Sequence, residues 1–598
     1  MQALILAAGM GNRLRPLSAK IPKALVEVNG KPILFNALDI LQRQGIKKTH
    51  IVLGYLGDII KEKVGNNWQG MEINYILNEE YDKTNNIYSL WMAHEVLNED
   101  TILMECDIYF EEALVNRLLT QNLENRVVVD NFKAGMDGTV VEINDKGEIK
   151  RLITSEDQGI NFDYSDKYKT VNIYLFTKDF LQKYFLPNLE LYIKTQSTNK
   201  YYELLLSVFI SMRNPILYAT VINDIKWLEI DDFSDLKKAE ILFADPMTKL
   251  QKAESAHGGY WRYDFTDFSY LYNLYFPTVA LLNDVRVNLD KLLINYPSCQ
   301  KELVKNLANW VGIESEYLTV GNGISEIIRI VNTNFIKKIA IPLPTFNEYE
   351  SGLKPEQLFY FDTTSNDFNL NLEDYAQAIK KENCSAALLI NPNNPTGKFC
   401  RLEEVKTFLE TLKDLELIIV DESFIGFVSE EGQSLEKVFK NYSNLVIVHS
   451  LGKELGILGV RLGYIVSVND KFNNLLRTYL PIWNVNSIAE YILEILPKYR
   501  KEHKESLIRV KEDRNYLLKR LEEIAYLKVL DSETNYIFCI LDEKIKSDEL
   551  RDKLFVKHNI LIKDCSNKKG LEDKKYIRIA VRTQSETDEL ISCLEKII

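Results

Sequence analysis

Cysteine and histidine are scarce in this sequence of 598 residues, and neither type forms a metal-binding pattern. The seven cysteines are an odd number and include no Cys-x-x-Cys pair, which argues against both a disulfide framework and a zinc site. The six histidines form no cluster, so neither a histidine metal site nor a Ser-His-Asp triad is indicated. The cysteines lie at positions 106, 299, 384, 400, 539, 565 and 593.

Long apolar runs and an excess of positive charge are also lacking. No apolar run reaches the ~18 residues that a membrane-spanning helix needs. The apolar run at residues 2–8 has no basic segment before it and continues into a glycine-rich turn, so we expect a buried strand rather than a signal peptide. The 86 acidic and 73 basic residues give a net charge of −13, which argues against a broad nucleic-acid-binding face. We expect a cytoplasmic protein that binds neither membrane nor nucleic acid.

The composition is typical of a globular protein, with 46% apolar and 27% charged residues. The length allows roughly two to four domains. Short β-rich runs alternate with helical stretches over residues 1–245, which predicts an α/β domain with a mostly parallel sheet. Residues 246–256 are predicted to be a helical linker, and residues 257–598 a second α/β domain.

A glycine-rich loop follows the first predicted strand. Gly9 and Gly11 allow the backbone to pass close to a phosphate group and to expose N–H groups to it. The whole string, LAAGMGNRLRPLS followed by PKALVEVNGKP, resembles the nucleotidyltransferases that act on sugar phosphates and choline phosphate. Within that class the chain is most similar to bacterial choline-phosphate cytidylyltransferases, because of YDKTNNIYSLWMA (Tyr81–Ala93), NKYYE (Asn199–Glu203) and WLEIDDFSDL (Trp227–Leu236).

This resemblance implies a Rossmann-like domain that transfers a nucleotide from CTP to a small acceptor. It assigns Arg13 and Lys23 to the triphosphate and the leaving pyrophosphate, where positive charge is needed. It assigns Mg²⁺ to Asp107, Glu229 and Asp231, since this cation prefers carboxylate oxygens. Glu229 and Asp231 are two residues apart, so in an extended strand they would share one face. The remaining implied contacts are Ala8, Gly9, Gly11, Asn86 and Ser89 for the nucleotide, and Lys169 and Asn172 for the acceptor.

Two of these assignments have an alternative. Lys169 could be an ordinary exposed lysine, and Asn172 a polar group at a strand edge.

A second set of motifs lies in the C-terminal part. Lys453 follows the predicted strand NLVIVHS in a loop of small residues, where a lysine can bind the aldehyde of a cofactor covalently. Asp421 ends another predicted strand, IIVD, and NPNNPTG (Asn391–Gly397) closes a third. GNGISE (Gly321–Glu326) is typical of a turn that opens a helix and can cradle a phosphate.

These motifs resemble the fold-type I aminotransferases that use pyridoxal 5′-phosphate (PLP). HGGYWRYDFTDFS (His257–Ser269), PTFNEYE (Pro344–Glu350) and YIRIAVRT (Tyr576–Thr583) are similar to the branch of histidinol-phosphate aminotransferases and threonine-phosphate decarboxylases. The resemblance implies that Lys453 binds PLP covalently and that Asp421 pairs with the pyridine nitrogen. It assigns Asn394 to the ring hydroxyl, Phe346 to the ring face, Gly323, Ile324, Ser450 and Arg461 to the phosphate, and Arg578 to the substrate carboxylate. Tyr296 would reach the site from a partner subunit, which implies a homodimer through this domain.

Two positions depart from the aminotransferase pattern. Phe424 stands where many aminotransferases carry a tyrosine that bonds the ring hydroxyl, although the decarboxylase-like relatives also carry phenylalanine there. Gly452 stands where a serine usually precedes the lysine, so Ser450 would replace that contact or the contact is absent.

The pair of domains resembles the bifunctional 2-aminoethylphosphonate cytidylyltransferase/aminotransferases of phosphonate biosynthesis. By this resemblance the C-terminal domain transaminates phosphonoacetaldehyde with an amino-acid donor. The N-terminal domain then joins the resulting 2-aminoethylphosphonate to CMP from CTP, releasing pyrophosphate.

Three alternatives remain open at this point. The C-terminal domain could decarboxylate phosphothreonine or phosphoserine, with an amino-alcohol phosphate as the acceptor of the N-terminal domain. The acceptor could instead be phosphocholine. Finally, the C-terminal domain could serve only as a dimerisation scaffold.

Overall fold

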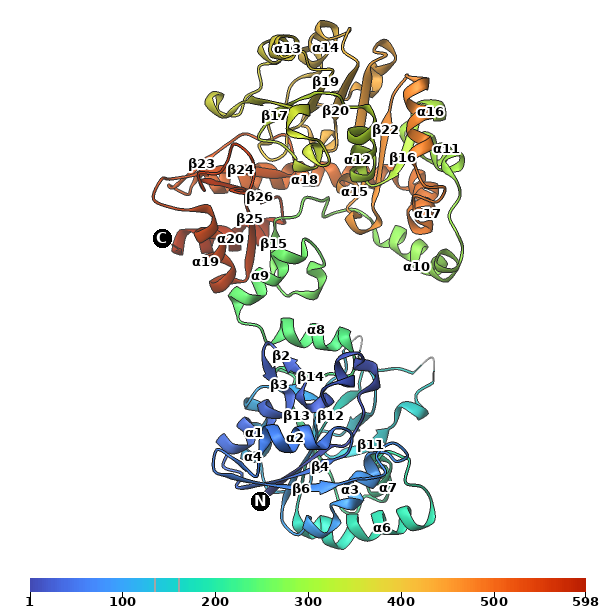
Figure 1. Cartoon of the computed structure of the whole chain (residues 1–598), viewed down its shortest axis with the longest axis vertical. Coiled ribbons are helices and arrows are strands. Elements are labelled where there is room, and N and C mark those ends of the chain that lie inside the picture. The colour runs from blue at the N-terminus through green and yellow to red at the C-terminus, as the bar shows by residue number, and fades with distance from the viewer. Residues whose placement is uncertain (134–135, 160–161, 598) are drawn as a thin grey trace. The chain divides into compact units, whose positions relative to one another are not determined.

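The computed structural model describes residues 1–133, 136–159 and 162–597 (Figure 1). The glycine-rich loop begins where the first strand, β1 (Gln2–Ala7), ends. The chain divides into two compact units, Met1–Tyr263 (unit 1) and Asp264–Ile598 (unit 2). Helix α9 (Pro246–Ala256), which the sequence predicts to be a linker, falls within unit 1. It buries Leu250 and Ala253, and Lys252 bonds to Asn29 and Glu240.

The described part of unit 1 contains a ten-stranded sheet with a parallel centre. β1 pairs in parallel with β4 (Lys48–Leu53) and β7 (Thr101–Glu105), and β4 pairs in parallel with β6 (Met71–Leu77). The sheet also contains antiparallel pairs, because β12 (Tyr168–Phe176) runs against β7. The other members are β5 (Asn67–Trp68), β9 (Arg126–Asn131), β10 (Val140–Ile143), β11 (Ile149–Ile153) and β13 (Tyr218–Val221). The predicted mostly parallel sheet is therefore a mixed one.

Helices cover both faces of this sheet. Alternate residues of β1 point to opposite sides, so Ala3 and Ile5 join one apolar cluster and Leu4 and Leu6 another. The first cluster includes α1 (Ile33–Arg43), α2 (Gly57–Val64) and α4 (Ala113–Thr120). The second includes α3 (Asn86–Met92), α6 (Leu186–Thr195) and α7 (Glu203–Met212). β8 (Ile108–Phe110) follows β7 in the chain and pairs with β14 (Trp227–Glu229). Helix α8 (Phe233–Leu242) follows β14.

Unit 2 is built on a seven-stranded sheet among the described residues. Its central strands are parallel and nearly all apolar, as expected for strands buried on both faces. The order across the sheet is β16 (Leu318–Asn322), β22 (Leu462–Val466), β21 (Leu445–His449), β20 (Leu417–Asp421), β19 (Ala386–Ile390), β17 (Ile339–Leu343) and β18 (Leu358–Asp362). β22 is antiparallel to both of its neighbours.

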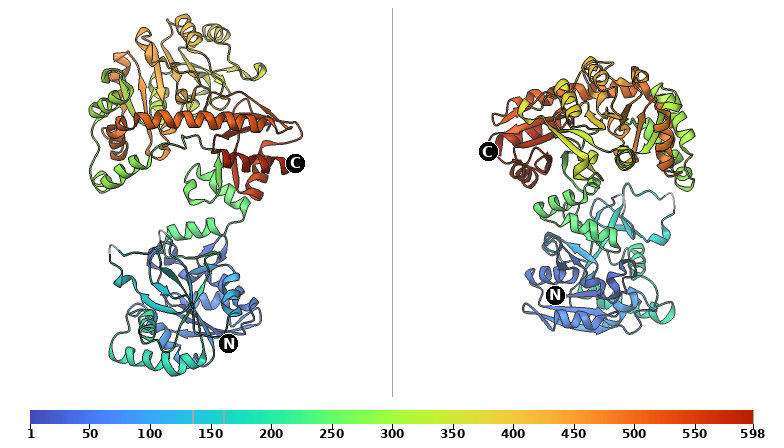
Figure 2. Two further views of the ribbon diagram at one scale, coloured as in Figure 1. Left: turned by 180° about the vertical axis from the view of Figure 1, so that it is seen from behind. Right: turned by 45° about the horizontal axis from the view of Figure 1, so that its top comes forward.

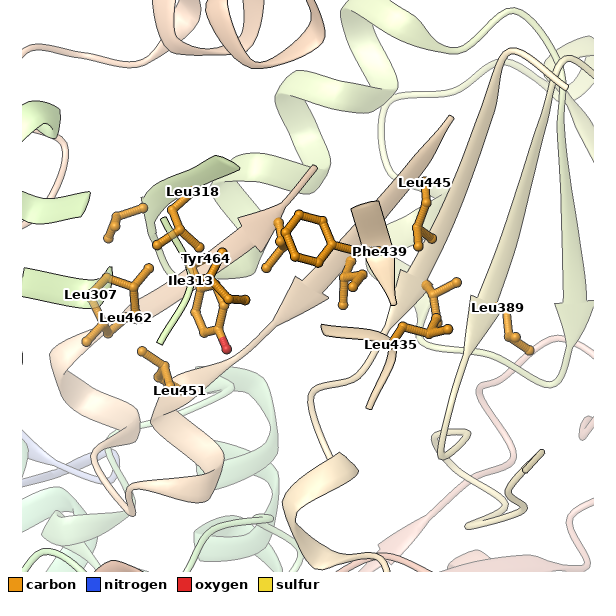
Figure 3. Close-up of a cluster of buried hydrophobic side chains, with 14 of the residues drawn as sticks. Leu307, Ile313, Leu318, Leu389, Leu435, Phe439, Leu445, Leu451, Leu462 and Tyr464 are labelled. Atoms are coloured by element: carbon orange, nitrogen blue, oxygen red, sulfur yellow. The ribbon is translucent and has the colours of Figure 1, made fainter. Parts of the chain in front are cut away.

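The core of unit 2 lies on both sides of that sheet. Leu318, Leu389 and Leu445 belong to the side shown in Figure 3. That side packs against α11 (Gln300–Val311), α13 (Leu372–Lys381), α14 (Leu402–Thr411) and α17 (Ser487–Ile495). The opposite side packs against α12 (Ile324–Phe335) and α16 (Asp470–Tyr479).

A second, five-stranded sheet completes the described part of unit 2. Its order is β15 (Thr266–Phe268), β25 (Ile560–Asp564), β26 (Tyr576–Ala580), β24 (Tyr536–Leu541) and β23 (Leu527–Val529). The long helix α18 (Arg500–Glu522) packs against β23, β24 and α20 (Gln584–Lys596), and α19 (Ser547–His558) packs against β25 (Figure 2). No helix in the described ranges is long and apolar enough to cross a bilayer.

Candidate active sites

Unit 1 has a cavity of about 750 Å³ where the carboxyl ends of β1, β7 and β14 meet. Ligands of open α/β sheets bind at this edge, because strands there end in loops that can carry polar side chains. All the unit 1 residues that the sequence predicts to be functional line this one cavity: Ala8, Gly9, Gly11, Arg13, Lys23, Asn86, Ser89, Asp107, Lys169, Asn172, Glu229 and Asp231.

The glycine-rich loop is shaped around Lys23. Gly11 has a φ of 58°, in the left-handed region that favours glycine. A Cβ at this position would also lie 3.0 Å from the Lys23 Cβ. Glycine therefore permits both the turn and the close approach of the loop to the lysine.

Lys23 lies between two carboxylates. Its Nζ donates to Asp107 Oδ2 at 2.5 Å and to Asp231 Oδ1 at 2.7 Å, and Arg13 Nη2 lies 2.8 Å from Asp231 Oδ2. Burial lowers the pKa of Lys23, but the charges of Asp107 and Asp231 outweigh burial and raise it above its usual value. The pKa of Asp231, which burial raises, is held below its usual value by Lys23 and Arg13. Asp107 and Asp231 are thus close enough to share one cation.

Glu229 contacts a different ammonium group. Its Oε2 lies 3.2 Å from Lys169 Nζ, and its Oε1 accepts from Asn172 at 3.3 Å. β14 ends at Glu229, but Glu229 and Asp231 both line the cavity, and a role for Glu229 in binding the metal stays a prediction. Lys169 is only 3% exposed, so the alternative of an ordinary exposed lysine is wrong.

The cation site is suited to Mg²⁺ held by two protein carboxylates. In the described ranges no group of three or more His, Cys, Asp or Glu side chains is arranged to hold a metal. Mg²⁺, however, usually takes one or two carboxylates and completes its shell with water and substrate phosphates. Asp107 Oδ1 is buried and has no hydrogen-bond partner among the described residues, so this carboxylate has a ligand atom besides the oxygen that contacts Lys23.

Two further carboxylates lie at the floor of the same cavity, and the sequence analysis missed both. Glu105 accepts from Asn86 Nδ2 at 3.0 Å, and Glu203 is 4% exposed with no hydrogen-bond partner at Oε2 in the described part. Burial raises the pKa of Glu105 well above its usual value and that of Glu203 to about 7. Together with Glu229, whose pKa burial also raises, they place three carboxyl groups on this floor that favour their protonated forms until a cation binds beside them.

In unit 2, Lys453 lies in the short helix α15 (Leu451–Glu454), just after β21. Its Nζ is 4.2 Å from the ring centre of Phe424 and 5.7 Å from that of Phe346. Lys453 is partly accessible to solvent, but its amine lies among protein atoms, and this burial lowers its pKa to about 8. Asp421 opposes that shift, while Arg578 and Arg461 add to it. A substantial neutral fraction near pH 8 suits an amine that attacks an aldehyde.

Asp421, at the end of β20, is held from two directions. Tyr349 Oη donates to its Oδ2 at 2.8 Å, and the backbone N–H of Ser423 donates to its Oδ1 at 2.8 Å. The sequence analysis did not assign Tyr349, although it lies within the PTFNEYE segment that carried the family resemblance. Asp421 is 3% exposed, so it is a fixed, buried carboxylate near Lys453.

The residues predicted to bind a cofactor phosphate include a small cradle. Gly323, which has a φ of 71°, precedes the first residue of α12, Ile324. A Cβ on Gly323 would lie 2.8 Å from Arg461 Nη2, so glycine leaves room for the guanidinium in this position beside the helix N-terminus. Ser450 directly precedes α15, and its N–H donates to Ser423 Oγ at 3.1 Å. A helix N-terminus next to an arginine fits a phosphate group.

Arg578 and Asn394 are directly bonded. Arg578 Nη1 donates to Asn394 Oδ1 at 2.7 Å and Nη2 donates to the Ser269 carbonyl at 2.8 Å, while its buried Nε has no partner in the described part. Lys568, which the sequence analysis did not assign, is 8% exposed and donates to the Thr345 carbonyl at 2.8 Å. Burial lowers its pKa to about 8. These cations bond to neutral groups, which favours an anionic ligand.

Tyr296 lies on the surface of unit 2. It is 77% exposed and its ring stacks on Trp483, with centres 4.2 Å apart. Its predicted role concerns a partner subunit and remains a prediction.

The comparisons with known proteins agree with this division into two sites. Residues 2–198 match the family model for nucleotidyl transferases, and residues 270–594 match that for class I and II aminotransferases. The chain is 31% identical to the CMP-5′-(3-aminopropyl)phosphonate synthase of Streptomyces rubellomurinus, over 100% of this chain and 95% of that protein. It is 34% identical to an L-serine phosphate decarboxylase of Campylobacter jejuni, over 51% of this chain and 80% of the relative.

Solved structures are similar to the C-terminal half. A decarboxylase from Sulfurospirillum multivorans superposes with a TM-score of 0.53 at 30% identity, over 59% of this chain and 91% of that one. A histidinol-phosphate aminotransferase from Clostridium acetobutylicum gives a TM-score of 0.52 at 27% identity, over 56% and 98%. The protein is therefore an enzyme with a nucleotidyltransferase domain and a fold-type I PLP-dependent domain, and it belongs to the class I and II aminotransferase family and to the same two-domain family as the Streptomyces synthase.

Proposed function

We propose that this enzyme makes a CMP-activated aminoalkylphosphonate in two steps. Unit 2 transfers an amino group from an amino-acid donor to phosphonoacetaldehyde, giving 2-aminoethylphosphonate. Unit 1 then transfers CMP from CTP to this phosphonate and releases pyrophosphate. The observation that carries the proposal is the charge pattern of the unit 1 cavity. Arg13 and Lys23 line the cavity beside Asp231, and the carboxyl groups of Glu105, Glu203 and Glu229 form its floor.

This pattern matches an acceptor with an anionic group and an ammonium group. In the transfer, a phosphonate oxygen forms a bond to the α-phosphorus of CTP, and the bond from that phosphorus to the bridging oxygen breaks. The electron pair leaves with pyrophosphate. Lys23 and Arg13 would neutralise the phosphoryl charge, which is the main contribution a protein makes to this reaction. Asp107 and Asp231 would hold Mg²⁺, which supplies further neutralisation when bound.

The carboxylate floor would recognise the amine. An ammonium group next to Glu203 and Glu105 stabilises their charged forms, so amine binding should release protons near pH 7, where Glu203 titrates. A quaternary ammonium such as choline has no N–H to donate to Glu203 Oε2. The unpartnered oxygen thus favours a primary amine.

In unit 2, PLP would supply an electron sink for the bond broken at the amino carbon. Lys453 would bind the cofactor aldehyde and, once released, carry the proton to and from that carbon. Asp421, fixed by Tyr349, would keep the pyridine nitrogen protonated, and Arg461 with the start of α12 would hold the cofactor phosphate. Arg578 would bind the carboxylate of the amino donor bidentately.

An apolar face of unit 2 supports a homodimer. Val279, Val287 and Ile294 of α10 (Val279–Ile294) are 72%, 83% and 81% exposed, and Tyr296 follows directly. Exposed apolar side chains concentrated on one helix are typical of an interface. We propose that α10 contacts a second copy of the chain.

A second candidate for unit 2 is decarboxylation of a phosphorylated amino acid. It is favoured by the similarity to L-serine phosphate decarboxylases and by Phe424 lying against Lys453. In that case Arg578 would bind the carboxylate that leaves as carbon dioxide, and the product would again be a small amine with a phosphoryl group.

Two assays test the proposal. With CTP and Mg²⁺, pyrophosphate release is measured for 2-aminoethylphosphonate, 3-aminopropylphosphonate, phosphoethanolamine and phosphocholine. We expect the aminoalkylphosphonates to give the highest kcat/KM, and turnover of phosphocholine alone would refute the assignment. For unit 2, amino transfer to phosphonoacetaldehyde is compared with carbon dioxide release from phosphoserine and phosphothreonine. The second outcome without the first would replace transamination by decarboxylation.

A further inference from the structure

A buried ionisable cluster lies directly behind the residues assigned to PLP. His449, the last residue of β21, places its Nε2 3.2 Å from Glu436 Oε1 and 3.5 Å from Glu422 Oε2. His449 is 6% exposed and Glu422 1%. Tyr464 of β22 donates to the same Glu436 oxygen at 2.7 Å and stacks on the imidazole, with ring centres 4.8 Å apart (Figure 3 shows Tyr464). The mechanism above uses none of these side chains.

The cluster holds His449 as a cation. Burial lowers the pKa of His449, but Glu436 and Glu422 outweigh burial and raise it to about 9. Burial raises the pKa of Glu422 to about 7, and the imidazolium opposes that shift. Glu454 of α15 also raises the pKa of His449, and Tyr464, whose own pKa is raised by burial, stacks on its ring. The contacts at Nε2 are those of an ion pair rather than an aligned hydrogen bond, so charge is what His449 contributes.

Two members of the cluster are sequence neighbours of residues assigned to the PLP site. Glu422 follows Asp421, and His449 precedes Ser450, which directly precedes the helix carrying Lys453. Glu422 is itself fixed, since Ser434 Oγ donates to it at 2.6 Å and the Leu435 N–H at 2.9 Å. The contact between Glu422 and His449 therefore links the end of β20 to the end of β21. Asp421 lies at the first of these strand ends, and the segment with Ser450 and Lys453 begins at the second.

We propose that His449, clamped between Glu422 and Glu436, is a positioning residue of the PLP-dependent reaction. It holds the segment with Ser450 and Lys453 in a fixed position relative to Asp421. The proposal rests on the proposed use of these three residues. It adds a requirement that the family resemblance does not supply, namely a positive charge at position 449.

The test compares His449→Arg, which keeps a permanent charge, with His449→Gln, which removes it, in the full-length enzyme. The PLP dissociation constant is measured from the visible absorbance of bound cofactor between pH 7 and 10. At pH 7.5 we expect the glutamine variant to bind PLP about tenfold more weakly, and the arginine variant to stay within about threefold of the original enzyme. Equal affinity of the glutamine variant and the original enzyme would overturn the proposal.

The pH dependence provides an independent readout. Because the folded-state pKa of His449 is raised, its ion pair is present at neutral pH and is lost as the pH rises through about 9. PLP affinity of the original enzyme should therefore fall over that range more than affinity of the arginine variant. Lys453 titrates in both proteins, so the difference between them isolates His449. Identical pH profiles would refute the positioning role.

Two controls keep the result interpretable. Glu436→Gln removes the strongest attraction on His449 and should move the fall in affinity to lower pH, which tests the idea even if the arginine variant does not fold. His503→Gln replaces another buried histidine, 3.4 Å from Glu454, and should leave the pH profile unchanged. If the original enzyme binds no PLP, the proposed function of unit 2 fails. If it binds PLP but His449→Gln binds equally well, only the positioning role fails.

Discussion

Replacing Lys23 by methionine should leave Asp107 and Asp231 facing each other without their shared cation. The two contacts of Nζ place Asp107 Oδ2 and Asp231 Oδ1 no more than about 5.2 Å apart. Two unit charges at that distance repel by about 3 kcal/mol at an effective dielectric constant of about 20. Methionine retains most of the apolar stem of lysine, so the loss reports charge rather than packing. Arg13 still contacts Asp231, so the expected loss in free energy of unfolding lies at the lower end of the range for breaking a buried ion pair.

Hydrogen exchange measured by mass spectrometry on the full-length enzyme suits this prediction, because it reports local stability in one unit of a two-domain chain. A loss of about 3 kcal/mol speeds exchange by a factor on the order of 100 in peptides from β7 and β14. Mg²⁺ should restore more protection in Lys23→Met than in the original enzyme, because the ion can take the place of the ammonium. Lys20→Met, a change of an exposed lysine in the same loop, is the matched control.

Two results would refute the reasoning. Unchanged exchange in β7 and β14 would mean that the carboxylates do not depend on Lys23 for charge balance. Equal protection of both proteins by Mg²⁺ would mean that the ion binds somewhere other than between Asp107 and Asp231.

Three further changes test the other assignments. Lys453→Ala should abolish PLP colour and amino transfer while leaving pyrophosphate release unchanged, and loss of both reactions in a folded protein would contradict independent sites. Glu203→Gln should raise KM for the amine acceptor but not for CTP. In the original enzyme the free energy of unfolding of unit 1 should fall as the pH rises from about 4.5 to about 7, because only the folded state, in which the pKa of Glu203 is raised, keeps the Glu203 proton over that range. Glu203→Gln should remove this fall. Val287→Glu together with Ile294→Glu should convert a dimer to monomers in sedimentation analysis, and an unchanged sedimentation coefficient would exclude this face as the interface.

The sequence predicted the parts of the sites that depend on strand ends and glycine turns. Lys453 and Asp421 come together because β20 and β21 are parallel neighbours, so both strands end at the same edge of the sheet. Gly11 and Gly323 were assigned from the glycine-rich loop and the family motif, and both have a positive φ, which favours glycine. These are local signals, and each needs only a short stretch of sequence to be recognised.

The missed residues depend on long-range packing instead. Tyr349 reaches Asp421 across 72 residues, and the path of the intervening chain decides that contact. Glu105 and Glu203 look like ordinary charges on a strand and a helix, and only the fold makes both of them line one cavity. The strand expected to continue through Glu229 and Asp231 stops at the first of them, although both residues line the cavity.

The two sites offer different groups at the positions where a small substrate would end. In unit 1 the floor carries the carboxyl groups of Glu105 and Glu203, and an ammonium group bound beside them would stabilise their charged forms. In unit 2 the buried cations Arg578 and Lys568 bond to neutral groups. A molecule made in unit 2 would be held by its anionic group, and its new amine would then be the feature that unit 1 recognises. Since an aldehyde precursor has no ammonium group to satisfy Glu203, the acidic floor would discriminate against it. The order of the two steps would follow from this charge, with amine formation first and nucleotide transfer second, without any requirement that the intermediate pass directly from one site to the other.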